Sequence, residues 1–427
     1  MKQSTLCLVA VCAAACSAVA PRMGPVPQPG PSVGDGGVPA FYTFESRVPG
    51  TPGQMLRSES SEARLVLEQA AGAERFLYTS TEGIDGETPI VVSGEVQFPK
   101  GDAPEGGWPI VAWAHGSVGV ADVCAPSLRG RSRRDHAYLN GYLEAGFAIV
   151  ATDYQGLGTA GPHPYLTLRP VGYGVLDSVR AALARYPQLA NRVFVVGQSQ
   201  GSQATLAAAY WAPLYAPEVE LLGAVATGLA ASIAEDHPAP KLEPVWPVQG
   251  EGNYIASAVF MLQYLGSYPA IDPGFDPKPH VAEELQSLYE AGRTGCLGPE
   301  MAEVANRQRI TLEQVLAHPV SAELQARLDR WQYFSFAQAK ITVPVFSGSG
   351  LADTLAPAAN HYNHLSAMCH QGTLVEFHYY DGHTHNSAVQ RSQRDALPFM
   401  RKLLAGEAVE SNCSELHPPG PIQDALY

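Results

Sequence analysis

The chain alternates, over most of its length, between short apolar runs and longer segments with helical periodicity. The apolar runs with the pattern of buried strands are 109–114, 147–153, 193–196, 221–227, 341–347 and 373–380. Helical patterns occupy about 135–145, 171–186 and 204–210 between them. Near-continuous apolar strands separated by helices are typical of a parallel sheet with both faces covered. The pattern therefore predicts an α/β fold with a mostly parallel central sheet.

Two regions depart from this alternation. Residues 41–100 carry β signals at 63–67, 75–80 and 89–98, separated by glycine-rich turns. Residues 230–338 contain no convincing core strand and are rich in helical and loop residues. Lying between two sheet strands, this interval is expected to form a mainly helical cap over the carboxyl ends of the strands, where such sheets bind ligands. Its apolar run 254–265 is either an ordinary buried helix or a wall that faces the substrate.

The N-terminal segment decides the compartment. Lys2 is followed by an apolar, alanine-rich stretch over 6–20 that is too short to span a bilayer, which predicts an export signal. Cleavage after Ala20 predicts a secreted protein, and a lipoprotein-like box ending at Cys16 gives a lipid-anchored protein as the alternative. Residues 21–40 are too rich in proline and glycine to pack and are expected to form a tether.

The expected organisation is thus an export signal at 1–20, a leader at 21–40, and a core in two parts at 41–229 and 339–427 around a cap at 230–338. The 427 residues, 46% of them hydrophobic, are ample for a large globular core. The net charge of −14 argues against nucleic acid or anionic membranes as principal partners. The basic run 129–134 is interpreted as a solvated loop rather than a phosphate site.

Cysteine usage fits an exported protein. Three of the seven cysteines lie in the expected signal, which leaves Cys124, Cys296, Cys369 and Cys413. Four cysteines predict two disulfides with three connectivities, of which Cys124–Cys296 with Cys369–Cys413 is favoured. Four buried free thiols are the alternative.

The strongest chemical signal is the sequence Gly-Gln-Ser-Gln-Gly at 197–201, which leaves a buried strand and enters a helix. This is the context of a nucleophile elbow, and it predicts Ser199 as the nucleophile of an α/β-hydrolase. Gly197 and Gly201 provide positions without a Cβ, which a very sharp turn needs for close backbone approach.

A serine hydroxyl needs a base, and the base needs a carboxylate that orients it. In α/β-hydrolases the order along the chain is serine, acid, histidine. Asp353, in the loop after the strand 341–347, is the predicted acid, and His385, at the start of the final helix, is the predicted base. His383 is the alternative base and Asp381 a weaker alternative acid, whereas His378 within the strand is expected to be structural.

The tetrahedral intermediate needs N–H donors, and the backbones of Gln200 and Ser117 are the predicted oxyanion hole. His115 is expected to brace its loop. The glycine-rich loop 153–165 is expected to line the cleft, and Asp153 has the wrong chain order for the catalytic acid. The sequence contains no cluster with zinc-ligand spacing and no cofactor signature, so no metal and no cofactor are expected.

These motifs resemble the secretory lipase family of α/β-hydrolases, the lipase-A-like group, over roughly residues 50–405. The resemblance rests on the segments 114–127, 153–159 and 197–201 and on the loops that carry Asp353 and His385. It implies a capped serine hydrolase acting on carboxylic esters, often acylglycerols, and a disulfide from Cys124 into the cap. Two departures are Ser202, where close relatives often carry glycine, and the additional His383.

The expected function is an exported lipase or esterase that cleaves hydrophobic esters through an acyl-serine intermediate, with a lipid–water interface as a further expected partner. The alternatives from the sequence are an acyltransferase that uses the same acyl-enzyme and a serine peptidase acting on small peptides. A binding module without catalysis fits least, because the nucleophile, acid and base loops are all intact.

Overall fold

A computed structural model describes residues 23–31, 34–229, 238–243, 254–296, 310–317, 319–322, 324, 326 and 340–427. The expected export signal at 1–20 lies outside the described residues. No helix in the described part of the chain is both long and apolar enough to span a membrane.

The described core is built on one nine-stranded sheet with the order β1-β2-β3-β5-β4-β6-β7-β8-β9. The pairs β1–β2, β2–β3 and β3–β5 are antiparallel. All remaining neighbours, from β5 through β4 to β9, are parallel. The strands are β1 (Met55–Ser60), β2 (Ala70–Thr81), β3 (Pro89–Pro99), β4 (Trp108–Ala114), β5 (Ala148–Thr152), β6 (Leu189–Gln198), β7 (Leu221–Thr227), β8 (Val345–Gly350) and β9 (Val375–Tyr380). The predicted α/β class and the mostly parallel sheet are confirmed.

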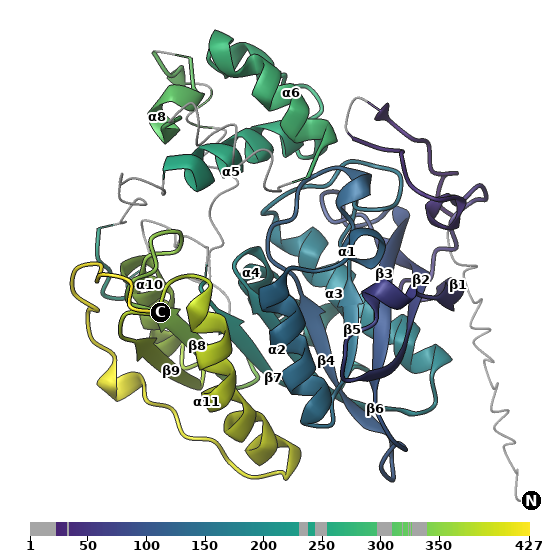
Figure 1. Cartoon of the computed structure of the whole chain (residues 1–427), viewed down its shortest axis with the longest axis vertical. Helices are drawn as coiled ribbons and strands as arrows, with labels where there is room; N and C mark the ends of the chain where they lie inside the picture. Colours follow the sequence, from purple (N-terminus) through teal and green to yellow (C-terminus); the bar gives the residue numbers. More distant parts are fainter. Residues whose placement is uncertain are drawn as a thin grey trace, which may run out of the picture.

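Helices cover both faces of this sheet (Figure 1). The helices α3 (Leu168–Arg185), α4 (Gln200–Tyr215) and α10 (Ala358–His370) pack on one face, and α2 (Arg133–Glu144) and α11 (Ser387–Leu404) pack on the other. Short α1 (Pro126–Arg129) precedes α2. One predicted strand is wrong: residues 63–67 begin with a 3-10 turn, Ala63–Leu65, while the edge strand β1 has no apolar alternation that would predict it.

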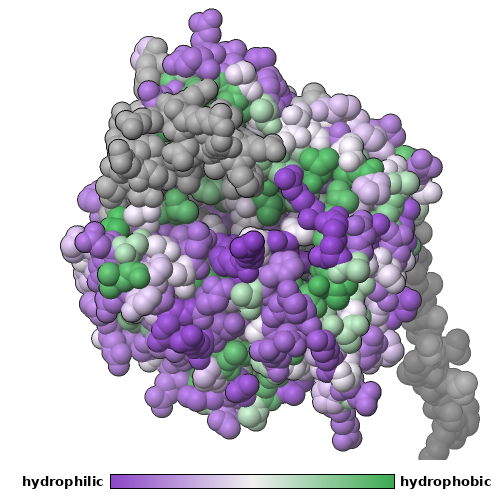
Figure 2. Space-filling model, viewed as in Figure 1, coloured by the Kyte–Doolittle hydropathy of each residue, from purple (hydrophilic) through white to green (hydrophobic). Residues whose placement is uncertain are grey.

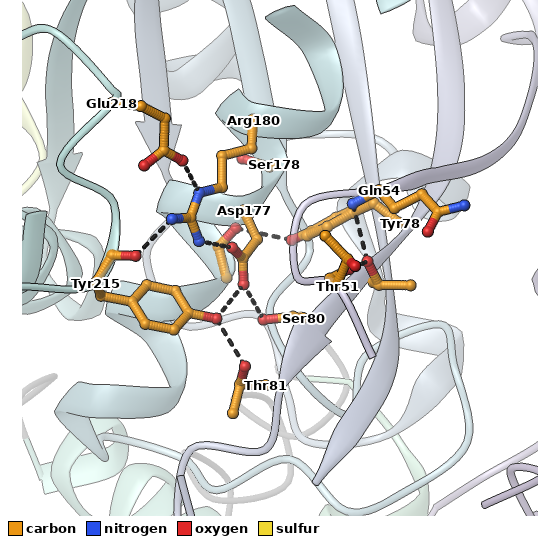
Figure 3. A network of polar contacts seen from close by, with 12 residues as sticks. Thr51, Gln54, Tyr78, Ser80, Thr81, Asp177, Ser178, Arg180, Tyr215 and Glu218 are labelled. Carbon is orange, nitrogen blue, oxygen red and sulfur yellow. Dashed lines mark hydrogen bonds and ion pairs between the residues drawn. The ribbon is translucent and has the colours of Figure 1, made fainter. Parts of the chain in front are cut away.

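A buried polar network fixes α3 to the sheet (Figure 3). The Asp177 carboxylate accepts hydrogen bonds from the hydroxyls of Ser80 on β2, at 2.6 Å, and Tyr215 at the end of α4, at 2.8 Å. Arg180 pairs with the same carboxylate at 2.9 Å. Burial raises the pKa of Asp177 to about 6, although the hydrogen bond from Ser80 and the charge of Arg180 both lower it. This carboxylate therefore holds three elements together.

Between β7 and β8 lie the helices α5 (Tyr254–Ser267), α6 (Gln286–Thr294) and α8 (Leu312–Val315), here called the insert helices. They lie beyond the upper end of the sheet in Figure 1 and have an apolar cluster of their own. Buried residues of α5 in this cluster include Ala258, Val259, Leu262 and Leu265, so this face of the apolar run 254–265 is an ordinary helix core. Val120 and Tyr165, from loops of the core, join the same cluster.

Both favoured disulfides are present. Cys124 pairs with Cys296 just after α6, and Cys369 at the end of α10 pairs with Cys413. Gly119 also forms a backbone bridge with Cys296. The segment 119–124 is therefore attached to the insert by a covalent bond and by main-chain pairing.

Removing the second disulfide should destabilise the fold. Cys369 and Cys413 are 44 residues apart, and a loop of that length contributes about 4 kcal/mol in the chain-entropy model. We expect a Cys369→Ser/Cys413→Ser variant to lose about 2–4 kcal/mol of unfolding free energy, measured by urea denaturation. Wild-type protein in reductant is the control and should lose stability as well. An unchanged midpoint for the variant would contradict the prediction.

The expectation that residues 21–40 do not pack is wrong for the described part. The carbonyl of Gly34 accepts from the N–H of Asp122 at 3.1 Å, and the N–H of Gly36 donates to the Asp122 carboxylate at 2.9 Å. The Asp35 carboxylate accepts from the N–H of Gly161 at 2.9 Å. Asp35 and Asp122 are both buried. These long-range contacts fix the proline-rich segment on the core, which local composition does not reveal.

This docking makes stability depend on pH. Burial, with the nearby Asp35 charge, raises the pKa of Asp122 from its ordinary 3.8 to about 7. As pH rises, the Asp122 carboxyl therefore loses its proton at lower pH in the unfolded chain than in the folded one. The folded state consequently loses stability between about pH 4 and pH 7. At 1.36 kcal/mol per unit, the full loss is about 4 kcal/mol.

We expect Asp122→Asn, which retains an oxygen acceptor for Gly36, to remove this loss. Its unfolding free energy should exceed that of the wild type by about 2–4 kcal/mol at pH 8 and by less than half as much at pH 5. Denaturation curves at the two pH values provide the measurement. An equal difference at both would mean that Asp122 does not titrate in this range.

Candidate active site

The turn between β6 and α4 has the conformation of a nucleophile elbow. Ser199 has φ 58° and ψ −124°, a backbone region that residues with a Cβ rarely adopt. A Cβ on Gly197 would overlap the carbonyl of Gly201, and one on Gly201 would overlap the carbonyl of Ala114. Both motif glycines are thus required by close backbone approach. The strained turn places Ser199 at the N-terminus of α4.

Two loops at the ends of β8 and β9 bring the predicted acid and base together. His385 Nδ1 lies 2.7 Å from Asp353 Oδ2, and both side chains are buried. The other oxygen of Asp353 accepts from the N–H groups of Leu355 and Ala356, each at 2.8 Å. The carboxylate is therefore held with one oxygen facing the ring. Because Nδ1–H donates to Asp353, the neutral imidazole keeps its lone pair on Nε2 for accepting a proton.

The end of β7 connects this pair to the elbow. The N–H of Ser199 donates to the carbonyl of Thr227 at 3.1 Å. A Cβ on the next residue, Gly228, would lie 3.1 Å from the Nδ1 and Cε1 atoms of His385. Gly228 has a φ of +59°, so a side chain there would be strained and would also press on the ring. The end of β7 thus lies against both the elbow and the Asp353–His385 pair.

The alternative residues have other surroundings. His383 Nδ1 lies 3.2 Å from the Ser387 hydroxyl, and its ring stacks on Tyr427 at 4.6 Å. Burial lowers the pKa of His383. Asp381 is exposed and accepts from Gln423 at 2.9 Å. His378 lies 3.0 Å from Glu376 and stacks on Phe346.

The loop after β4 lies directly against the elbow. A Cβ on Gly116 would lie 3.5 Å from the Cβ of Ser199. The hydroxyl of Ser117 lies 2.5 Å from the hydroxyl of Tyr165, so this side chain already has a partner. Gln200 is the first residue of α4, so its N–H is among those without an intrahelical partner.

His115 braces this loop, as expected from the sequence. It is 3% exposed, with Nδ1 at 2.7 Å from the Gly116 carbonyl and Nε2 at 3.2 Å from the Asp153 carbonyl. Asp153 itself accepts from the Ser93 hydroxyl at 2.6 Å and the Ser127 N–H at 2.9 Å. This carboxylate has a structural role, consistent with its position before Ser199 in the chain.

The loop 153–167 also supports both predicted oxyanion residues, a detail that the sequence does not reveal. The Gln200 amide lies 3.2 Å from His163 Nε2, while His163 Nδ1 lies 2.7 Å from the Gln155 carbonyl. Burial lowers the pKa of His163 to about 4, so the ring is neutral. Its Nδ1–H donates to Gln155, and its Nε2 accepts from Gln200. Tyr165, which belongs to the apolar cluster of the insert, similarly holds Ser117.

Gln198, the residue before the nucleophile, is a second residue that sequence reasoning missed. It is fully buried, and neither polar atom of its side chain has a partner among the described residues. A Cβ on Gly116 would lie 3.0 Å from its Oε1, and one on Gly228 would lie 3.6 Å from its Nε2. Its amide thus lies between the loop after β4 and the residue beside His385.

Within the described residues, no group of three or more histidine, cysteine, aspartate or glutamate side chains is arranged to hold a metal ion. The residues that the described site brings near the elbow are therefore an aspartate and a histidine in hydrogen-bonding distance of each other.

Comparison with known proteins identifies the family of the chain. The family model described as Secretory lipase matches residues 131–412. Lipase 7 of Candida albicans is 34% identical over 93 residues, and Lipase A of Arthroderma benhamiae is 37% identical over 97 residues. Each of these matches covers 21% of the chain and about a fifth of the curated relative.

Solved structures share the fold at low identity. Candida antarctica lipase A in its closed state matches with a TM-score of 0.64 and 18% identity, covering 94% of this chain and 90% of that one. The rice cell wall degrading esterase LipA of Xanthomonas oryzae matches with a TM-score of 0.61 and 15% identity, covering 84% and 100%.

The family match and the fold define a protein of the α/β-hydrolase class. The family match extends over more than half of the chain and includes the elbow and the loops of Asp353 and His385. This chain belongs to the secretory lipase family.

Proposed function

We propose that the protein is an exported serine hydrolase that cleaves hydrophobic carboxylic esters, acylglycerols among them, through an acyl-serine intermediate. The observation that carries the proposal is the buried Asp353–His385 pair at 2.7 Å beside the strained turn of Ser199.

In this mechanism Ser199 Oγ attacks the ester carbonyl while His385 Nε2 takes its proton. Asp353 keeps the ring in the required tautomer and stabilises the imidazolium that forms. The main-chain N–H groups of Ser117 and Gln200 bind the oxyanion. His385 then protonates the departing alcohol, which leaves the acyl group on Ser199. Water, deprotonated by the same histidine, releases the acid and restores the serine.

The insert helices are inferred to form the cap, covering the site from the side where the strands end. The disulfide from Cys124 and the Tyr165–Ser117 contact, at 2.5 Å, connect this cap to the oxyanion loop. Family membership and the alanine-rich segment at 6–20 support export, by secretion or through a lipid anchor at Cys16. Lipid–water interfaces are the setting in which such an enzyme would meet acylglycerols.

The test combines rates with covalent labelling. Initial rates would be measured on p-nitrophenyl esters from acetate to palmitate and on an emulsified triacylglycerol. A p-nitrophenyl phosphonate, which traps activated serines, would be followed by peptide mass spectrometry. Hydrolysis together with one phosphonate on Ser199 is expected. Label elsewhere, or no hydrolysis of any ester, would overturn the proposal.

A further inference from the structure

A cavity of about 630 Å³ lies beside the oxyanion loop, and apart from Ser117 its described lining has no part in the proposed mechanism. Its described lining comes from the loop after β4, from α1 and the start of α2, and from the residue next to His385. Among the lining residues are Gly116, Arg129, Arg131, Arg134, Asp135 and Asn386.

Three of the described lining residues are arginines and one, Asp135, is a carboxylate. We call this the arginine pocket. The sequence suggested a solvated loop for 129–134, but the Arg131 side chain is only 4% exposed. Figure 2 shows strongly hydrophilic residues across the middle of this face, near the upper ends of α2 and α11.

The positive charge of the pocket is only partly compensated. Arg131 pairs with the buried Glu95 at 2.7 Å, but its Nε is buried without a partner among the described residues. Arg134 pairs with Asp135 at 2.8 Å and donates to Asn386 at 2.8 Å. Arg129 has no ion pair within the described part of the chain. The three arginines are therefore balanced by only two carboxylates, Glu95 and Asp135. The N-terminus of α2, which carries partial positive charge, lies in the same segment.

The pocket shares residues with the loops next to the candidate catalytic residues. Gly116 lines it and also lies against Ser199, and Asn386 follows the predicted base His385. The protein has a net charge of −14, so much of its surface repels anions. A pocket with excess positive charge beside the active site is therefore a place where an anionic ligand is favoured.

We propose that the arginine pocket binds an anionic group, a carboxylate or a phosphate, carried by the ester substrate. This proposal rests on the proposed function and narrows its substrates to esters with a negative charge near the scissile bond. Guanidinium groups suit both anions, because their planar N–H donors match pairs of oxygens.

The experiment compares matched neutral and anionic esters. The phosphate arm uses 1-butyrylglycerol and 1-butyrylglycerol 3-phosphate. The carboxylate arm uses the butyryl ester of glycolamide and that of glycolate. We expect kcat/KM to be about tenfold higher for the anionic member of at least one pair, and this preference to fall as salt rises from about 0.05 to 0.5 M. The arm that responds identifies the anion.

Two variants assign the preference to the pocket. Arg129→Gln should reduce the anionic-to-neutral ratio about threefold to tenfold, since Arg129 lines the cavity and has no ion pair within the described part of the chain. Arg133→Gln is the matched control, because Arg133 is exposed, lies in the same segment and is absent from the described lining. It should leave the ratio unchanged.

Equal kcat/KM values within both pairs would overturn the proposal while leaving ester hydrolysis intact. Equal effects of Arg129→Gln and Arg133→Gln would attribute the preference to general surface charge and would also overturn it. If no ester is hydrolysed, the proposed function fails instead. Calorimetric titration of the Ser199→Ala variant with 1-butyrylglycerol 3-phosphate then decides the pocket: binding weakened by Arg129→Gln supports it, and no binding refutes it.

Discussion

Ser199→Ala should lower kcat for p-nitrophenyl butyrate by about 10⁶-fold, the scale found when a serine hydrolase loses its nucleophile. Alanine removes the atom that forms the acyl bond, and no other hydroxyl is placed at the tip of the elbow by the same strained turn. Steady-state rates and the phosphonate label, which should disappear, are the measurements.

Ser202→Ala is the matched control for this change. Ser202 lies in the same elbow, is fully buried, and its hydroxyl donates to the carbonyl of Ser199 at 2.5 Å. Its replacement removes a hydroxyl of the same kind one helical turn away and should cost no more than about tenfold in kcat, because the nucleophile stays in place. If Ser202→Ala abolished hydrolysis while Ser199→Ala retained it, the elbow would be misassigned.

Most of the core was predictable because its signals are local. The apolar strands, the helices between them and the glycines of the elbow are determined by residues close in sequence, and the order serine, acid, histidine places the remaining loops. The paired side chains Asp353 and His385 follow from loops that leave adjacent parallel strands, β8 and β9. The structure brings them within 2.7 Å.

What the sequence could not predict depends on contacts between distant segments. The leader at 21–40 packs on the core because the N–H of Gly36 donates to the carboxylate of Asp122, 86 residues further along the chain. Tyr165 holds Ser117 across 48 residues, and His163 holds Gln200 across 37. The basic run 129–134 has the composition of a solvated loop, yet burial against Glu95 places Arg131 in a cavity wall. None of these contacts leaves a periodic pattern.

The two histidines of the final loop should differ in effect by several orders of magnitude. His385→Ala should lower kcat nearly as far as Ser199→Ala, because the serine proton then has no acceptor. His383→Ala should retain activity to within about tenfold. The His383 ring lies 3.2 Å through Nδ1 from the Ser387 hydroxyl and stacks on Tyr427. Removing this ring is therefore expected to affect packing rather than proton transfer.

Asp353→Asn extends the same comparison to the orienting carboxylate. The asparagine can still accept from Leu355 and Ala356 through its oxygen, but it then presents an amide N–H to His385 Nδ1. That contact favours the tautomer with the proton on Nε2, which cannot accept from the serine. We expect a loss in kcat of about 10⁴-fold with the fold intact, measured by stopped-flow acylation rates and near-ultraviolet circular dichroism. An active Asp353→Asn enzyme would refute the assignment of the orienting acid. An inactive His383→Ala enzyme beside an active His385→Ala enzyme would give the role of base to His383.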